Sequence, residues 1–302
     1  MSLLITGSVA LDSVKTPLQE HRDLLGGSAS YASVAASFFG PVQMVAIVGT
    51  DFPEKYLALY RKHGIDIDGL QIADGKTFRW SGEYEWDLNN RRTLSVNLNV
   101  FESFQPRLPE SYKRTPYVFL ANISPQLQAH VLAQVAAPKF IVADTMDLWI
   151  ETQREALTEL LRQIDCLVLN ESEAREFTKE ASLIKAGRLL LNMGPKYVVI
   201  KKGEHGCLLF GKDFFFSAPA YPLEDIHDPT GAGDCFAGAF TGYLARANHI
   251  DPKSLRKAVI YGSVIASYCV EDFSLTRLES ITEPQINERY GLFKSMSHFD
   301  VA

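Results

Sequence analysis

Short apolar segments alternate with segments of helical periodicity along most of this 302-residue chain. Two of the apolar segments, 166–169 and 197–200, have no polar face. A strand that is apolar on both sides suits a parallel sheet that helices cover on both sides. The sequence therefore predicts an α/β fold with a doubly wound, mostly parallel sheet flanked by helices. Strands are expected at 3–5, 42–48, 117–120, 140–143, 166–169 and 197–201, and helices at 28–39, 54–63, 126–136, 152–161, 171–177 and 184–192.

The segment 77–86 departs from this pattern, because apolar and polar residues alternate strictly along it. Its aromatic residues share one face: Phe78, Trp80, Tyr84 and Trp86. A period of two is typical of a half-exposed strand. Turn residues follow at 87–90, and the alternation resumes at 94–100. We predict a β-hairpin that projects from the main body as a lid, with an antiparallel edge of the central sheet as the alternative.

Charge and hydropathy exclude several kinds of partner. The net charge of −6 and the pI of about 5.7 disfavour a nucleic acid partner, since nucleic-acid-binding proteins usually carry a clustered basic face. Arg91 and Arg92 form only a basic pair, which is interpreted as solvated surface charge. No apolar run has the length of a membrane-spanning helix, and the first residues lack a basic signal region. We expect a cytoplasmic protein without a membrane partner.

The four cysteines, at 166, 207, 235 and 269, have neither the spacing of a zinc site nor that of a disulfide framework. We expect reduced and buried thiols.

The run Asp-Pro-Thr-Gly-Ala-Gly-Asp at 228–234 carries the clearest chemical signal, because it leads directly into an apolar helix that extends to about Ala247. A helix N-terminus presents unpaired N–H groups and a partial positive charge. Residues 231–233 can therefore form an anion hole. Asp234 beside that hole fits a base that takes a proton from an attacking hydroxyl during phosphoryl transfer. The alternative is an aspartate that merely caps the helix.

The complete run closely resembles the C-terminal signature of the ribokinase-like (PfkB) family of carbohydrate and nucleoside kinases. Further landmarks of that family follow one another in order along the chain: 7–12, 26–35, 48–51, 63–65, 170–173 and 200–206. The resemblance implies one ribokinase-like kinase domain over 1–302, with a β lid formed by about 12–25 and 77–101.

The resemblance also implies roles for individual residues. Asp234 would be the general base, and the anion hole would consist of Gly231, Ala232 and Gly233. The substrate would be bound by Asp12, Gly26, Gly27, Ser28 and Tyr31. ATP would be bound by Lys201, Gly203, Gly206 and Ser263. Asn170 and Glu173 would organise Mg²⁺ and its waters, and Asp228 with Thr230 would lie near a site for an activating K⁺.

Several of these residues have a plainer interpretation. Asp12 is also compatible with a turn residue, and Asn170 and Glu173 with exposed helix residues. Many family members carry asparagine where this chain has Ser28 and Tyr31, so the acceptor stays open.

The leading hypothesis is phosphorylation of a hydroxyl on a small sugar or sugar acid by MgATP. A nucleoside kinase of the same fold is the alternative, favoured by the aromatic lid face and Tyr31. A binding protein without catalysis is a third possibility, which the intact Asp234 disfavours. A homodimer through the lid is also expected.

Overall fold

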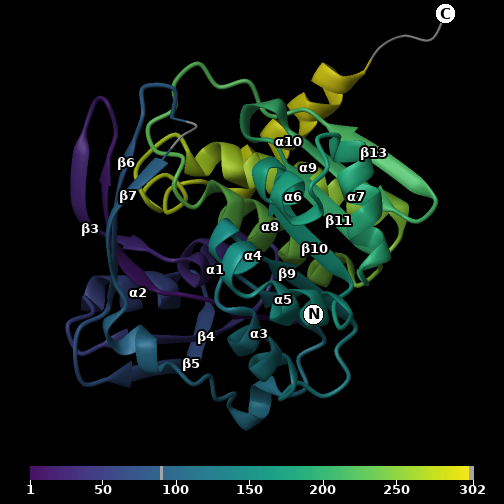
Figure 1. The fold of residues 1–302 in the computed structure, drawn as a ribbon. Coiled ribbons are helices and arrows are strands. Elements are labelled where there is room, and N and C mark those ends of the chain that lie inside the picture. The colour runs from purple at the N-terminus through teal and green to yellow at the C-terminus, as the bar shows by residue number, and fades with distance from the viewer. Residues whose placement is uncertain (89–90, 299–302) are drawn as a thin grey trace, which may run out of the picture.

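The computed structural model describes residues 1–88 and 91–298, and it contains two separate β-sheets (Figure 1). In the nine-stranded sheet the order is β13 (Phe214–Ala218), β12 (Cys207–Gly211), β11 (Tyr197–Lys201), β10 (Cys166–Asn170), β9 (Phe140–Asp144), β8 (Tyr117–Leu120), β1 (Leu3–Thr6), β4 (Val42–Gly49) and β5 (Ile65–Ala73). All neighbouring strands are parallel except at β11–β12 and β12–β13. This arrangement confirms the predicted α/β class.

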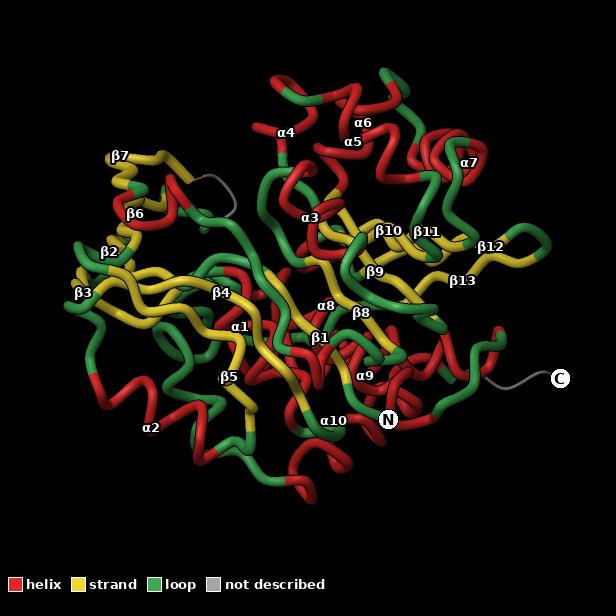
Figure 2. Tube along the Cα trace, turned by 90° about the horizontal axis from the view of Figure 1, so that it is seen from below, coloured by secondary structure: helices red, strands yellow, loops and turns green. Residues whose placement is uncertain are grey.

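Helices cover both faces of this sheet, as Figure 2 shows from its edge. On one face lie α3 (Pro125–Leu132), α4 (Asp147–Thr152), α5 (Arg154–Leu161), α6 (Glu171–Thr178) and α7 (Leu183–Asn192). On the other lie α1 (Ser28–Ser37), α2 (Glu54–Lys62), α8 (Ala232–Ala247), α9 (Pro252–Cys269) and α10 (Glu283–Ser297). Short 3₁₀ turns occur at Asn99–Ser103, Glu110–Tyr112 and Gly203–His205. The helix predicted at 152–161 corresponds to α5, and α4 is a separate helix that precedes it, because the backbone leaves the helical region at Gln153 with φ −135°.

Alternate residues of the central strands pack into two different hydrophobic cores. Leu3 and Ile5 pack into the core that includes α1, α8 and α9, while Leu4 between them packs into the core beneath α3 to α7. The side chains of a strand point alternately to opposite faces, so a strand between two helix layers must be apolar throughout. Full burial of one such side chain contributes about 1.5–3 kcal/mol.

The second sheet has four strands in the order β3 (Glu20–Gly26), β2 (Ala10–Lys15), β6 (Phe78–Tyr84) and β7 (Arg91–Asn97). Strands β6 and β7 are antiparallel, whereas β2 and β6 are parallel. The predicted hairpin is therefore present, and its alternative as an edge of the central sheet is wrong. Residues 89 and 90 of the predicted turn lie outside the described residues.

The details of the hairpin differ from the strict alternation of its sequence. The pairing of β6 with β7 shifts between Ser81 and Gly82, and β6 ends at Tyr84. Trp86, expected on the aromatic face, lies beyond the strand with 86% of its surface exposed. A β-bulge interrupts the ladder and changes the direction of the residues that follow it.

Candidate active site

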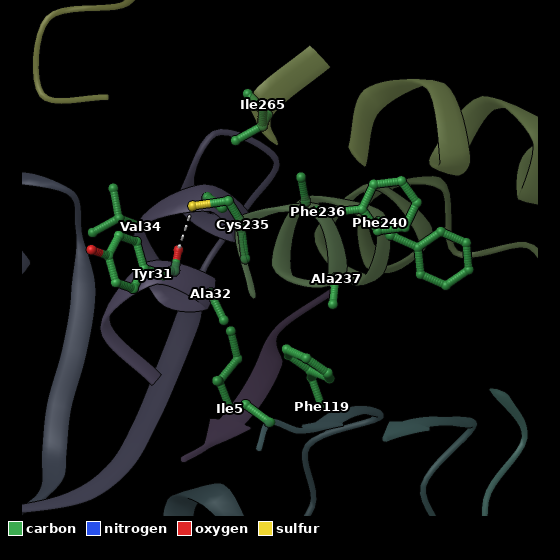
Figure 3. Close-up of a cluster of buried hydrophobic side chains, with 14 of the residues drawn as sticks. Ile5, Tyr31, Ala32, Val34, Phe119, Cys235, Phe236, Ala237, Phe240 and Ile265 are labelled. Carbon is green, nitrogen blue, oxygen red and sulfur yellow. Dashed lines mark hydrogen bonds between the residues drawn. The ribbon is translucent and has the colours of Figure 1, made fainter. Parts of the chain in front are cut away.

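The N-terminus of α8 lies where the sequence predicts an anion hole, and the N–H of Ala232 there already donates to the carbonyl of Pro229 at 3.2 Å. Gly231 precedes the helix in the left-handed region, with φ 77°. A Cβ built on Gly231 would lie 2.3 Å from Cδ1 of Tyr31, so both the backbone conformation and the close packing require glycine. Figure 3 shows Tyr31 and Ala32 of α1 facing Cys235 and Ala237 of α8. This packing brings the glycine-rich start of α1 next to the anion hole.

Asp234 lies in the first turn of α8 and is half-buried. Desolvation and the negative charge of Asp144 raise the pKa of Asp234 to about 7, against the opposing positive charges of Lys201 and Arg91. A general base is most effective when its pKa lies near the working pH. The environment of Asp234 therefore suits it to accept a proton from an alcohol.

Asp12, on β2, is 5% exposed, and its Oδ1 has no hydrogen-bond partner among the described residues. A Cβ built on Gly26 would lie 1.9 Å from Asp12 Oδ2, so the carboxylate lies directly against that glycine. Burial, followed by the charges of Asp228 and Asp234, raises the pKa of Asp12 to about 8. A buried carboxylate oxygen without a partner is costly, and a substrate hydroxyl would satisfy it. This geometry favours substrate contact over a simple turn role.

The other predicted substrate residues also lie near Asp12, and each makes a contact that supports the fold. Gly27 has φ 90°, and a Cβ there would lie 2.4 Å from the carbonyl oxygen of Ser8. Ser28 Oγ accepts from the N–H of Ser8 at 3.1 Å and donates to the carbonyl of Asn122 at 3.0 Å. Tyr31 is 2% exposed, and its ring packs against Gly231. Their direct contact with substrate stays a prediction.

A pocket of about 360 Å³ adjoins the anion hole on the side of α9. Its lining contains all four residues predicted to bind the nucleotide: Lys201, Gly203, Gly206 and Ser263. Ala232 and Gly233 of the anion hole also line it, together with the apolar side chains of Tyr221, Leu223, Ile226, Phe236 and Val270. Asp87 and Leu88, from the turn after β6, close one side. The volume and the apolar wall fit a flat ring system whose polar tail points toward α8.

The carboxyl ends of three parallel strands carry polar groups beside this pocket. Asp144 ends β9, Asn170 ends β10 and Lys201 ends β11. Lys201 Nζ lies 2.9 Å from Asp144 Oδ2, and the two side chains are 16% and 4% exposed. Ligands of open α/β sheets bind at the carboxyl ends of the strands. Asp144 was not predicted from the sequence, although its place at the end of a buried strand is a usable signal.

Asn170 and Glu173 form a capping box on α6, and Glu173 is buried rather than an exposed helix residue. Glu173 Oε2 accepts from the Asn170 N–H at 2.7 Å, and Asn170 Oδ1 accepts from the Glu173 N–H at 2.8 Å. Burial raises the pKa of Glu173 to about 8. In 1–88 and 91–298, no group of three or more His, Cys, Asp or Glu residues is arranged to hold a metal. A magnesium that is bound with ATP and contacts these residues through water stays a prediction.

The small sheet places an aromatic ring and a cation near Asp12. Trp80 is the direct neighbour of Asp12 in the parallel pairing of β2 with β6. The guanidinium carbon of Arg91 lies 5.7 Å from the Trp80 ring centroid. Arg91 is exposed, as expected for surface charge, but its charge also lowers the pKa of Asp12 and of Asp234 against the larger effect of their burial. Arg92, in contrast, pairs with Glu83 at 2.7 Å on the outer face.

Asp228 and Thr230 hold the loop before α8. Asp228 Oδ1 accepts from the Thr230 N–H at 2.9 Å, and Thr230 Oγ1 donates to the hydroxyl of Tyr84 at 3.1 Å. The second contact joins the small sheet to the anion-hole loop.

Two sequence expectations concern the chain as a whole. All four cysteines are free and buried, as predicted. Across the described residues, none of the helices combines the length and the apolar character needed to cross a membrane.

Comparison with known proteins identifies the family of the chain. The sequence model of the pfkB family carbohydrate kinase matches residues 8–281. A cytidine kinase of Thermococcus kodakarensis is 30% identical over 258 residues, covering 83% of this chain and 91% of that protein. Fructokinase-2 of Oryza sativa subsp. japonica is 24% identical over 264 residues, covering 81% of this chain and 78% of that protein.

Solved structures resemble this fold closely. A nucleoside kinase of Methanocaldococcus jannaschii, an archaeal member of the ribokinase family, aligns with a TM-score of 0.78 at 19% identity, covering 96% of this chain and 98% of that chain. An aminoimidazole riboside kinase of Salmonella enterica, complexed with aminoimidazole riboside and an ATP analogue, aligns with a TM-score of 0.76 at 18% identity, covering 96% of this chain and 100% of that chain. At these identities the likeness shows the fold, and it confirms the one predicted.

Proposed function

Because the chain belongs to the pfkB family of carbohydrate kinases, we propose that this ATP-dependent kinase acts on a nucleoside, phosphorylating the primary hydroxyl of its ribose. The sequence alone favoured a free sugar or sugar acid and kept the nucleoside as the alternative. The observation that carries the revised preference is the position of Trp80 directly beside Asp12. One residue offers a ring face, and the other offers a buried carboxylate oxygen.

A nucleoside needs both of these features. Its base stacks on an aromatic ring, a contact that contributes about 1–3 kcal/mol per base. Its ribose hydroxyls donate hydrogen bonds, and Asp12 Oδ1 is an acceptor without a partner among the described residues. Arg91, close to the same ring, adds donors that suit the acceptor atoms of a base edge. A free sugar would use the carboxylate but would not stack on the Trp80 ring, which lies near Arg91.

The relatives include both kinds of kinase and do not decide between them. The cytidine kinase is 30% identical to this chain, and a bifunctional ribokinase/ribose-5-phosphate isomerase A of Fructilactobacillus sanfranciscensis is 31% identical over 271 residues. The fructokinase keeps the free sugar as a second candidate.

The proposed reaction uses the residues at the N-terminus of α8. The acceptor hydroxyl transfers its proton to Asp234 while its oxygen attacks the γ-phosphorus of ATP. The bond from that phosphorus to the β–γ bridging oxygen breaks, and ADP leaves. The N–H groups of Gly231 and Gly233 and the Lys201 ammonium oppose the negative charge on the transferring group. ATP supplies the phosphoryl group, and magnesium, when bound to it, neutralises part of its charge.

Three further expectations belong to this proposal. Potassium activation near Asp228 and Thr230 would appear as a higher rate in KCl than in NaCl of equal ionic strength.

A homodimer through the lid is supported by β7, whose seven residues are all exposed and include Leu94 and Val96. Light scattering tests it. A cytoplasmic location agrees with four free, buried thiols, and fractionation tests it.

The acceptor is identified by screening ADP release over nucleosides and free sugars with MgATP. Phosphorus and proton NMR of the product then locate the new phosphate ester. We expect a nucleoside monophosphate esterified at the primary hydroxyl. Phosphorylation of free sugars alone would refute the nucleoside assignment.

A further inference from the structure

One buried ion pair beside the anion hole neither gives nor takes the proton in the transfer just described. Lys201 ends β11 and Asp144 ends β9, so their side chains meet across the end of β10, which lies between them. The distance from Nζ to Oδ2 is 2.9 Å, and both side chains are largely removed from water. Burying both charges is costly, so a contribution to stability alone does not explain the pair.

The ammonium also lies against the anion hole. A Cβ built on Gly233 would lie 3.0 Å from Lys201 Nζ, so the absence of a side chain at Gly233 leaves space for the cation. Lys201 also lines the nucleotide pocket. The ammonium therefore stands where the terminal phosphates of a nucleotide would meet the helix N-terminus.

The charged groups around this cation come from several elements. Asp144 of β9, Glu173 of α6 and Asp234 of α8 all act on Lys201, and together they raise its pKa against the opposing effect of burial. Only Asp144 makes an ion pair with Lys201 within the described residues. A lysine side chain has four flexible bonds, and holding its ammonium at one point requires a fixed partner.

We propose that Asp144 is a positioning residue that holds the Lys201 ammonium beside Gly233, where it binds the terminal phosphates of ATP. The inference rests on the proposed use of ATP, but not on the identity of the acceptor. Asp144 touches neither substrate in this scheme and acts through Lys201. Without it the ammonium is free to turn toward Glu173 or solvent, and the phosphates lose a charged contact.

The first measurement is calorimetric binding of a non-hydrolysable ATP analogue and of AMP to the full chain. Asp144→Asn should weaken binding of the triphosphate by about tenfold, the scale of one hydrogen bond between charged groups. AMP affinity should stay within about twofold, because AMP lacks the terminal phosphates, and this result also shows that the variant is folded. Unchanged affinity for the triphosphate would overturn the proposal.

A double-mutant cycle tests whether Asp144 acts through Lys201. Lys201→Met should weaken triphosphate binding at least as much as Asp144→Asn does, and the double variant should bind no more weakly than Lys201→Met alone. Independent effects that add would overturn the proposal. The kcat with the screened acceptor should follow the same non-additive pattern.

The chain offers a control pair at the opposite, amino ends of strands β10 and β11. Lys196 Nζ lies 2.7 Å from Asp165 Oδ1, and these residues immediately precede β11 and β10. Asp165→Asn breaks another aspartate–lysine pair far from the pocket, and it should leave triphosphate affinity unchanged. An equal loss in this control would overturn the proposal by assigning the effect to general destabilisation. Absence of triphosphate binding by the wild-type protein would instead overturn the use of ATP as well.

Discussion

The ring of Tyr31 lies directly beneath Gly231, where a Cβ would be 2.3 Å from Cδ1 of the tyrosine. This contact joins the first turns of α1 to the anion hole before α8, two regions from opposite halves of the chain. The small sheet is joined to the same loop by the hydrogen bond between Tyr84 and Thr230. The proposed acceptor residues, base and phosphate site therefore lie on elements that contact one another directly.

Asp234→Asn should abolish turnover and preserve nucleotide binding. The amide is nearly isosteric with the carboxylate but accepts no proton, so kcat should fall by roughly 10²-fold or more. Steady-state kinetics and calorimetric binding of the ATP analogue measure the two effects separately. Activity within a few-fold of the wild type would show that Asp234 is only a helix residue.

The pH dependence of kcat/KM should report the same carboxylate. Asp234 must be ionised to accept a proton, and its pKa is raised to about 7. The rate should therefore fall as pH decreases below about 7 and level off above it. Asp12, with a pKa of about 8, is the other candidate for this limb. Asp12→Asn should keep the limb near pH 7, and its disappearance in that variant would assign the titration to Asp12.

Gly233→Val should damage catalysis more than folding. Gly233 has ordinary helical backbone angles, so strain is not the reason. Its added side chain would instead meet the Lys201 ammonium, 3.0 Å from the new Cβ, and crowd the N–H donors. We expect kcat to fall at least about tenfold with little change in Tm. Gly231→Ala is the contrasting variant, because strain and contact with Tyr31 should lower its Tm. The opposite pattern would show that residue 233 is only structural.

Trp80→Ala should raise the KM for a nucleoside by roughly tenfold, the loss expected when one base-stacking ring is removed. Trp86→Ala is the matched control, because its indole is 86% exposed beyond the end of β6. Its KM should equal that of the wild type. Equal effects of the two substitutions would place the base elsewhere.

Local sequence pattern predicted the central strands because each is a short run that must be apolar on both faces. Sheet neighbours were harder to predict, since β2 and β6 pair in parallel although they are far apart in the chain. The register shift between Ser81 and Gly82 was also missed, although a glycine inside a strand often marks a bulge.

In the site, too, local motifs could be interpreted from the sequence and contacts between distant residues could not. The glycine-rich loop and Asp234 belong to one continuous motif, so their roles could be proposed from the sequence alone. Asp144 was missed because its meaning depends on Lys201, two strands away in the sheet. Arg91 was interpreted only as surface charge, because its approach to Asp12 depends on the register of β6 with β7.

The central claim is a nucleoside kinase with Asp234 as its base, and a competition assay tests it most directly. Wild-type protein and Asp234→Asn receive MgATP with an equimolar mixture of cytidine, adenosine, ribose and fructose, and product formation gives relative kcat/KM values. The account predicts that a nucleoside monophosphate dominates with the wild type and that all products are lost with Asp234→Asn. A dominant sugar phosphate, or undiminished product from Asp234→Asn, would contradict it.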